Sequence, residues 1–116
     1  DRFSNLLKTI GDEDYEKYSS LLSQVRSACQ KHLFDEKENA FVNVADNKQY
    51  SVHSQVWMIL GGVIDGNEAK EILQNCLGDS DAKQPCTPYM HHYVVRQRLT
   101  FQNPYFQFVL IVLLLL

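Results

Sequence analysis

The sequence contains little cysteine, and this narrows the classes of site that it can build. Its three cysteines, at positions 29, 76 and 86, include no CxxC pair. A zinc ribbon or a dithiol redox motif needs such pairs, so neither is predicted. A disulfide between Cys76 and Cys86 is conceivable, but free buried cysteine is the simpler interpretation. We therefore predict no metal site and no cofactor.

Positive charge is also scarce. The chain has 11 Lys and Arg against 14 Asp and Glu, a formal net charge of −3, and no basic stripe. Nucleic acid is therefore not an expected partner. The first residues lack the basic-then-apolar pattern of a signal peptide. The localisation is unknown from this stretch, and a periplasmic or secreted parent protein stays open.

Long apolar runs are limited to one, at residues 105–116. The run reads YFQFVLIVLLLL, with a single glutamine as its polar residue. A membrane-spanning helix needs roughly 20 apolar residues, so this run is too short to cross a bilayer. We expect it either to dock on a partner or to reflect a frameshifted or truncated end.

Five segments carry helical signals, and two kinds of helix alternate among them. Residues 51–64 and 88–95 are apolar nearly all round, which predicts buried helices. Residues 12–33 and 67–77 carry one apolar stripe each, which predicts peripheral helices; residues 3–10 have the same spacing. Such alternation is typical of consecutive helical hairpins in an α/α barrel or an α-solenoid. The sequence therefore predicts an all-α fold.

Residues 34–50 break the helical pattern. Residues 40–44 alternate weakly and predict a short extended piece, and residues 46–48 predict a turn. Ser51 or Ser54 is expected to cap the next helix. Within that helix, Gly61 and Gly62 lower helix stability but would let a neighbouring helix approach closely.

Polar and aromatic residues gather at the starts of the two predicted buried helices. Aromatic faces stack on sugar C–H surfaces, and Gln, His and Ser hydrogen-bond hydroxyls, so these residue types suit a pocket for a neutral sugar. The first cluster is Tyr50, Ser51, His53, Ser54, Gln55 and Trp57, and the second is Thr87, Tyr89, His91 and His92.

Each of these residues also has a plain structural interpretation. Trp57 is most simply a core residue, and the serines and Thr87 are most simply helix caps. His91 and His92 are adjacent, so on a helix they diverge by ~100° and cannot face one point. His53 with one of that pair lacks a third ligand, so zinc is not predicted.

Catalytic residues are not identifiable. Glycoside hydrolysis uses a pair of carboxylates, and the two predicted buried helices contain no Asp or Glu. No serine or cysteine lies in the glycine pattern of a nucleophile elbow. We therefore predict that the chain alone is inactive as a hydrolase.

Two stretches resemble a known enzyme family. YSVHSQVWMILGGVIDGNEAKEILQNCL and the following TPYMHHYVV are similar to late helical hairpins in the catalytic domain of bacterial α-L-rhamnosidases, glycoside hydrolase family 78. The resemblance covers residues 1–95 and implies part of an (α/α)6 barrel, a fragment of an enzyme that hydrolyses terminal α-L-rhamnose with inversion. The family's general acid lies upstream of the matched part, so no catalytic residue carries over.

The resemblance also implies a site and partners. The starts of the inner helices would line or support the sugar pocket, which selects Tyr50, His53, Gln55, Tyr89, His91 and His92 as substrate-binding residues. The expected partners are a rhamnoside and either the remainder of the catalytic domain or an oligomeric partner that covers the apolar surface.

The similarity stops near Arg96, where both identity and helical period are lost. Residues 96–116 are therefore predicted to be a divergent apolar tail. Two alternatives remain open: a non-enzymatic helical interaction module, and another glycosidase family with the six-hairpin fold.

Overall fold

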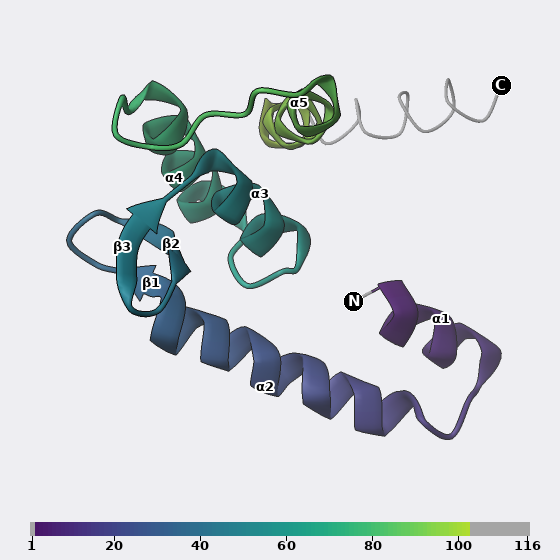
Figure 1. The fold of residues 1–116 in the computed structure, drawn as a ribbon. Helices are drawn as coiled ribbons and strands as arrows, with labels where there is room; N and C mark the ends of the chain where they lie inside the picture. The colour runs from purple at the N-terminus through teal and green to yellow at the C-terminus, as the bar shows by residue number, and fades with distance from the viewer. Residues whose placement is uncertain (1, 103–116) are drawn as a thin grey trace, which may run out of the picture.

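The computed structural model describes residues 2–102 of the chain, which fold as five helices and a small sheet (Figure 1). The sheet is three-stranded and antiparallel, so the fold is α+β and the prediction of an all-α helical-hairpin barrel is wrong. The elements are α1 (Arg2–Ile10), α2 (Tyr15–Leu33), β1 (Phe34–Asp35), β2 (Ala40–Val44), β3 (Asn47–Tyr50), α3 (Val52–Leu60), α4 (Gly66–Gly78) and α5 (Pro88–Gln102).

The sheet forms where the helical period is lost. The predicted extended piece is β2, and it pairs with β1 in the register Phe34↔Phe41 and with β3 in the register Val42↔Tyr50. Local turn chemistry closes both hairpins. The Asp35 carboxylate accepts the N–H groups of residues 37 and 38, and the Asn47 side chain accepts the N–H of residue 49. These two hydrogen-bonded turns place β1 and β3 on either side of β2, so the predicted extended piece is the middle strand of a sheet.

Helix α3 is shorter than the predicted 51–64 segment. Ser51 caps it as expected, because its hydroxyl accepts the Ser54 N–H. The helix ends before Gly61, and Gly62 has a φ of +68°, a left-handed conformation that glycine adopts without steric cost. Arg26 of α2 lies against this turn and donates from Nε to the Gly61 carbonyl at 2.9 Å. Because Gly62 has no side chain, an arginine from a neighbouring helix can approach this turn closely.

The core lies among α3, α4, α5 and β2. Two adjoining clusters of buried side chains hold these elements together. One is Val52, Val56, Leu73, Cys76, Ala82, Met90 and Val94, and the other is Phe41, Ile64, Ala69 and Ile72. Helix α4 contributes to both clusters, which makes it the central element of the body.

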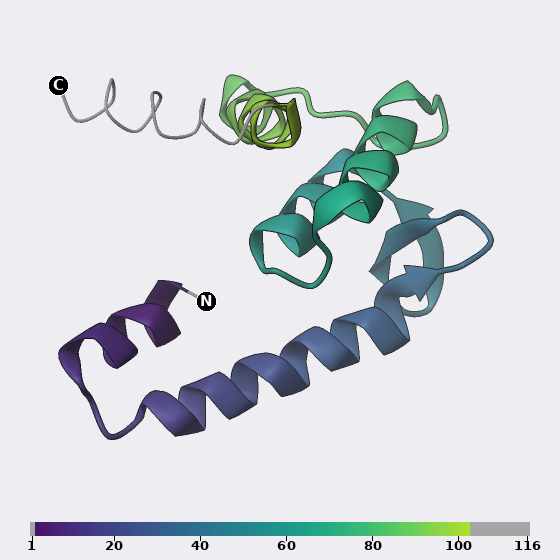
Figure 2. The ribbon, with the colours of Figure 1, turned by 180° about the vertical axis from the view of Figure 1, so that it is seen from behind.

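Helices α1 and α2 project from this body (Figures 1 and 2). Helix α2 forms where the amphipathic pattern predicted a helix, but it buries none of its residues. Leu21 and Val25 of its predicted stripe are each about half exposed. The helix prediction is correct, and the apolar side of the helix is partly covered, with Tyr18, Leu22 and Leu33 half-buried.

Helix α5 continues past Arg96, where the sequence predicted that the helical pattern is lost. Thr87 Oγ1 accepts the Met90 N–H at 3.4 Å, and Pro88 is the first helical residue, both as predicted. The helix runs through Arg96 to Gln102 because Arg, Gln and Leu are good helix formers even without an apolar period. The rest of the predicted tail, residues 103–116, lies outside the described residues.

The three cysteines are free, and they differ in exposure. Burial raises the pKa of the Cys76 thiol to about 11, and the negative charge of Asp79 adds to that effect. Cys86 is exposed, and the two do not form the disulfide that the sequence left open. Within residues 2–102, none of the helices has the length and apolarity that a membrane span requires.

Candidate functional site

Gln55 is a structural residue at the junction of α3 and β2. Its side chain is fully buried, its Oε1 accepts the Phe41 N–H at 2.9 Å, and its Nε2 donates to the Phe41 carbonyl at 2.9 Å. The second amide hydrogen goes to the Ser51 carbonyl at 3.0 Å. Gln55 therefore pairs with Phe41 as a neighbouring strand would, and both of its amide hydrogens are used within the fold.

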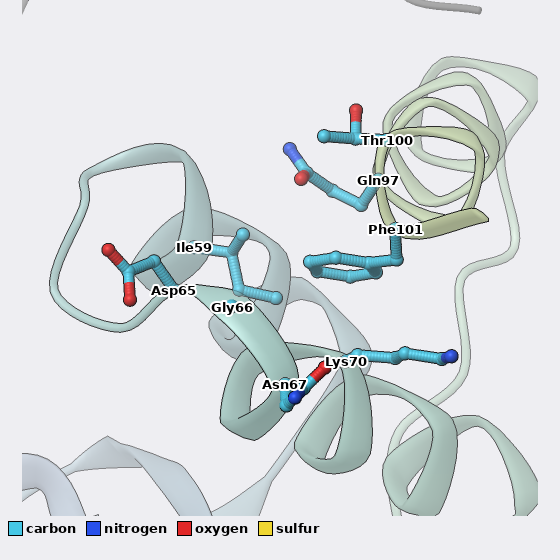
Figure 3. A pocket seen from close by; sticks show the side chains of 8 residues that line it. All are labelled: Ile59, Asp65, Gly66, Asn67, Lys70, Gln97, Thr100 and Phe101. Carbon is cyan, nitrogen blue, oxygen red and sulfur yellow. The ribbon is translucent and has the colours of Figure 1, made fainter. Parts of the chain in front are cut away.

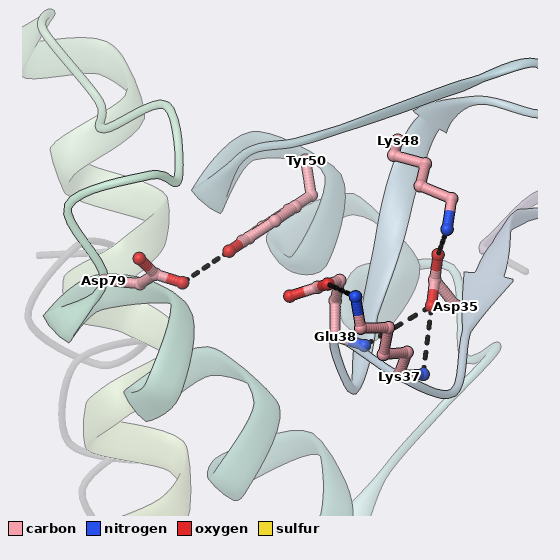
Figure 4. Close-up of polar contacts among 6 residues, drawn as sticks. All are labelled: Asp35, Lys37, Glu38, Lys48, Tyr50 and Asp79. Atoms are coloured by element: carbon pink, nitrogen blue, oxygen red, sulfur yellow. Dashed lines mark hydrogen bonds and ion pairs between the residues drawn. The ribbon is translucent and has the colours of Figure 1, made fainter.

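Tyr50 fastens the loop after α4 to the start of α3. Its hydroxyl donates to Asp79 Oδ2 (Figure 4). This hydrogen bond, followed by burial, raises the pKa of Tyr50 to about 12. The same bond, with the Asp81 N–H on Oδ1 at 2.8 Å, holds the pKa of Asp79 below its ordinary value. The backbone supports the link, because Lys83 exchanges hydrogen bonds with Tyr50 and Val52.

The charged side chains of the hairpin form ion pairs of their own, and the negative charge of Glu38 also raises the pKa of Tyr50. Asp35 forms an ion pair with Lys48 across 4.0 Å, and Lys37 lies 3.8 Å from Glu38 (Figure 4). The lysine of each pair is largely exposed, so each pair contributes little to stability. A polar groove of about 370 Å³ beside them is lined by His32, Asp35 and Lys48 among others.

An exposed group of rings on α3 and α5 is the strongest candidate for a binding surface. We call it the aromatic platform, and it comprises Trp57, Tyr89, His92 and Tyr93. The Tyr93 ring lies at its centre, with centroids 5.2 Å from Trp57, 5.1 Å from Tyr89 and 5.4 Å from His92. Tyr89 is 63% exposed and Trp57 is 46% exposed. Rings that contact each other yet remain open to solvent offer a ready surface for an apolar ligand face.

Helical spacing produces the platform. Tyr89 and Tyr93 are four residues apart on α5, so they share one face, while Met90 and Val94 share another face and are buried. The two tyrosine hydroxyls lie 3.2 Å apart, and this hydrogen bond raises the pKa of Tyr89. Trp57 follows the buried Val56, so it faces outward from α3 toward Tyr93.

The predicted site residues are thus only partly brought together. Tyr89 and His92 join the platform, and His53 is half-buried one helical turn before Trp57, on the same face of α3. His91 is exposed and diverges from His92 around α5, as its adjacent position predicted. Tyr50 and Gln55 hold structural hydrogen bonds and lie outside the platform.

Two platform residues were not among the predicted site residues. Trp57 was interpreted as core, but a nine-residue helix on one side of a small body leaves part of its surface in solvent. Tyr93 was counted only as an apolar helix residue. Its spacing of four from Tyr89 was the available signal, because residues at that spacing share a helix face.

A second hollow lies between the start of α4 and the last turns of α5 (Figure 3). We call it the α4–α5 groove. Its volume is about 410 Å³, and its lining is Ile59, Asp65, Gly66, Asn67, Lys70, Gln97, Thr100 and Phe101. It shares no residue with the aromatic platform, although α3 and α5 contribute to both.

Acidic residues are absent from the two helices of the aromatic platform. Helices α3 and α5 contain no Asp or Glu, so no carboxylate pair can come from the two helices that form the platform. Among residues 2–102, no three His, Cys, Asp or Glu side chains are grouped to hold a metal ion.

Comparison with known proteins finds no matching protein family, no matching curated protein and no matching solved structure. The similarity to α-L-rhamnosidases thus stays a prediction from the quoted residues.

Proposed function

We propose that this chain recognises carbohydrate through the aromatic platform and binds a terminal α-L-rhamnose unit as a fragment of a rhamnoside-processing protein. The observation that carries the proposal is the exposure of Trp57 and Tyr89, whose rings both contact Tyr93. Leaving aromatic rings exposed to water costs free energy, and a group of such rings can bind the apolar surface of a ligand.

The chemistry of the ligand fits this surface. Rhamnose is a deoxy sugar whose methyl group and ring C–H faces make one side apolar, and such a side packs on aromatic rings. The hydroxyls of Tyr89 and Tyr93 and the His92 ring supply hydrogen bonds at the edge of the surface. His53 lies one turn from Trp57 and extends the polar margin. A few polar groups beside an apolar face are typical of small-ligand sites.

The fluorescence of Trp57 gives a direct test, because it is the sole tryptophan. We expect saturable changes on titration with L-rhamnose and weaker changes with D-glucose. Tyr89→Ala removes one of the four rings of the platform. It should weaken rhamnose binding by about tenfold, which corresponds to a loss of ~1.4 kcal/mol of binding free energy. The matched control is Tyr15→Ala on α2, which should bind as the parent does. Equal binding by the two variants would refute the platform.

The chain alone is proposed not to hydrolyse rhamnosides. Without carboxylates on α3 and α5, neither a general acid nor a general base is positioned at the platform. Release of nitrophenol from a nitrophenyl rhamnoside by the pure chain would contradict this part of the proposal.

A second candidate function is a protein-interaction module, and the exposed apolar side chains of α1 and α2 favour it. Leu6 and Ile10 of α1 are more than half exposed, as is Leu21 of α2. Such a surface suits an oligomeric partner or another part of a larger domain. Light scattering on the purified chain tests self-association. A dimer that Leu21→Lys dissociates would support this candidate, whereas a monomer at high concentration would argue against it.

A further inference from the structure

Gln97 is a buried polar residue that the fold leaves without a partner. It lies on α5 with 6% of its surface exposed, and the structure gives its side chain no hydrogen bond to any of residues 2–102. Burying an amide without a partner costs free energy, so such residues call for an explanation. In the same part of the chain, every fully occluded side-chain nitrogen or oxygen has a partner. The Gln97 amide must therefore reach the open space of the α4–α5 groove.

The groove is arranged around that amide. Figure 3 shows the Gln97 side chain extending from α5 toward Ile59, with the Phe101 ring below it and Thr100 above it. Thr100 donates its own proton to the Arg96 carbonyl, so its oxygen remains an acceptor. The groove thus offers the hydrogen-bonding groups of Gln97 and Thr100 next to an apolar surface. Ile59 and Phe101 form that apolar surface.

The charges of the lining are balanced. Asp65 supplies one carboxylate and Lys70 supplies one ammonium group, and Figure 3 shows them on different sides of the groove. Asp65 makes no side-chain hydrogen bond to the start of α4, so its oxygens remain available. One charge of each sign favours neither a simple anion nor a simple cation, whereas it provides a strong acceptor and a strong donor to a neutral ligand.

We propose that the α4–α5 groove binds a small, uncharged, polyhydroxylated ligand of about monosaccharide size, with the Gln97 amide as its central hydrogen-bonding group. The volume of about 410 Å³ falls within the usual range of roughly 300–1,000 Å³ for small-molecule sites. Ile59 and Phe101 receive the C–H face of the ligand, and Asp65, Lys70 and Thr100 receive its hydroxyls. This site is separate from the aromatic platform and does not rest on the function proposed for it.

The side-chain amide of Gln97 is itself the reporter in an NMR titration of the ¹⁵N-labelled chain. L-rhamnose and D-glucose are the probes, and inorganic phosphate is the charged control. We expect saturable shifts of the Gln97 NH₂ pair with one or both sugars and none with phosphate. The same shifts should persist in Tyr89→Ala, which damages only the platform. Loss of the shifts in that variant would overturn a separate site, and so would shifts with phosphate alone.

Gln97→Leu separates a binding role from a structural one. Because Gln97 has no partner in the fold, an apolar side chain of similar size should keep or raise the Tm. The substitution should weaken sugar binding in the groove by about tenfold or more, because leucine cannot form the hydrogen bonds that the Gln97 amide makes to the ligand. Shifts of the backbone amides at Lys70 and Phe101 report on this variant.

Gln30→Leu is the matched control, because Gln30 is exposed on α2, far along the sequence from the groove. It should bind both sugars as the parent does. Unchanged binding by Gln97→Leu, or a clear drop in its Tm, would overturn the assignment, as would the absence of any shift with either sugar.

Discussion

At the scale of single residues, the same side-chain type serves different purposes according to its partners. Gln55 and Gln97 are both buried glutamines on helices that form the body. Gln55 satisfies its amide against the Phe41 backbone, whereas Gln97 has no such partner and faces a groove. The sequence suggested Gln55 for ligand binding and did not select Gln97. Only the position of β2 beside α3 distinguishes the two.

Gln55→Leu should destabilise the chain strongly. The substitution leaves both the N–H and the carbonyl of Phe41 buried without partners. At about 1–3 kcal/mol for each of these two groups, the free energy of unfolding should fall by roughly 2–6 kcal/mol. Urea denaturation followed by circular dichroism measures this change. Gln49→Leu on the exposed face of β3 is the control, with an expected change within about 0.5 kcal/mol. Similar losses in the two variants would be inconsistent with a pairing role for Gln55.

At the scale of elements, a few local residues determine where a helix ends and where a hairpin turns. The long apolar stripes do not determine these positions. Helix α3 ends four residues earlier than the predicted 64, because the chain turns away at Gly62, which is in the left-handed conformation and lies against Arg26. Residues 34–50 were expected to hold one extended piece, and the Asp35 and Asn47 turns complete a sheet around it.

Gly62→Ala should weaken the junction between α2 and α3. Its φ of +68° is costly for an L-residue, and an added Cβ would lie 2.5 Å from Arg26 Nη2. We expect a loss of about 1–2 kcal/mol from the backbone alone. Part of the clash can be relieved by movement of the flexible Arg26 side chain. Thermal unfolding provides the measurement.

The control is Gly78→Ala at the end of α4, where an added Cβ meets nothing within 4 Å. Alanine is the better helix former, so this change should be neutral or stabilising by up to about 1 kcal/mol. A Gly62→Ala variant as stable as the Gly78→Ala variant would argue against a strained turn at Gly62.

At the scale of the whole molecule, the body and the projecting helices behave differently. The body of α3, α4, α5 and the sheet has a buried core, while α2 buries no residue. The loop of residues 79–87 closes the body by returning to the start of α3, and Tyr50 and Asp79 form its side-chain link. The stability of the body should therefore depend on pH through this pair.

Tyr50→Phe should lower the Tm of the chain at neutral pH, with a pH profile set by the two groups. The pKa of Asp79 is lowered in the fold, so its contribution is present above its ordinary value of 3.8 and is lost as pH falls through the depressed value. The pKa of Tyr50 is raised from 10.0 to about 12, so its contribution is full below pH 10 and is lost as pH rises through about 12.

The difference in Tm between the parent and Tyr50→Phe should therefore be largest and flat between about pH 5 and pH 9, and should shrink at both extremes. Circular dichroism melts measure it across that range and beyond both of its ends, down to pH 3 on the acid side. Tyr15→Phe on α2 is the control, with no expected change. A difference that stays constant down to pH 3 would mean that Asp79 is not the partner.

Local structure followed from the sequence alone: the five predicted helical segments, the extended piece at 40–44 and the caps at Ser51 and Thr87. These follow from side-chain periodicity and from hydrogen bonds between near neighbours, which need no tertiary context. The tertiary structure decided the fold class, the junction of Gln55 with β2, the exposure of Trp57 beside Tyr93 and the unpaired amide of Gln97. Each of these depends on which elements pack together, and a periodic pattern indicates that a face is apolar without indicating what covers it.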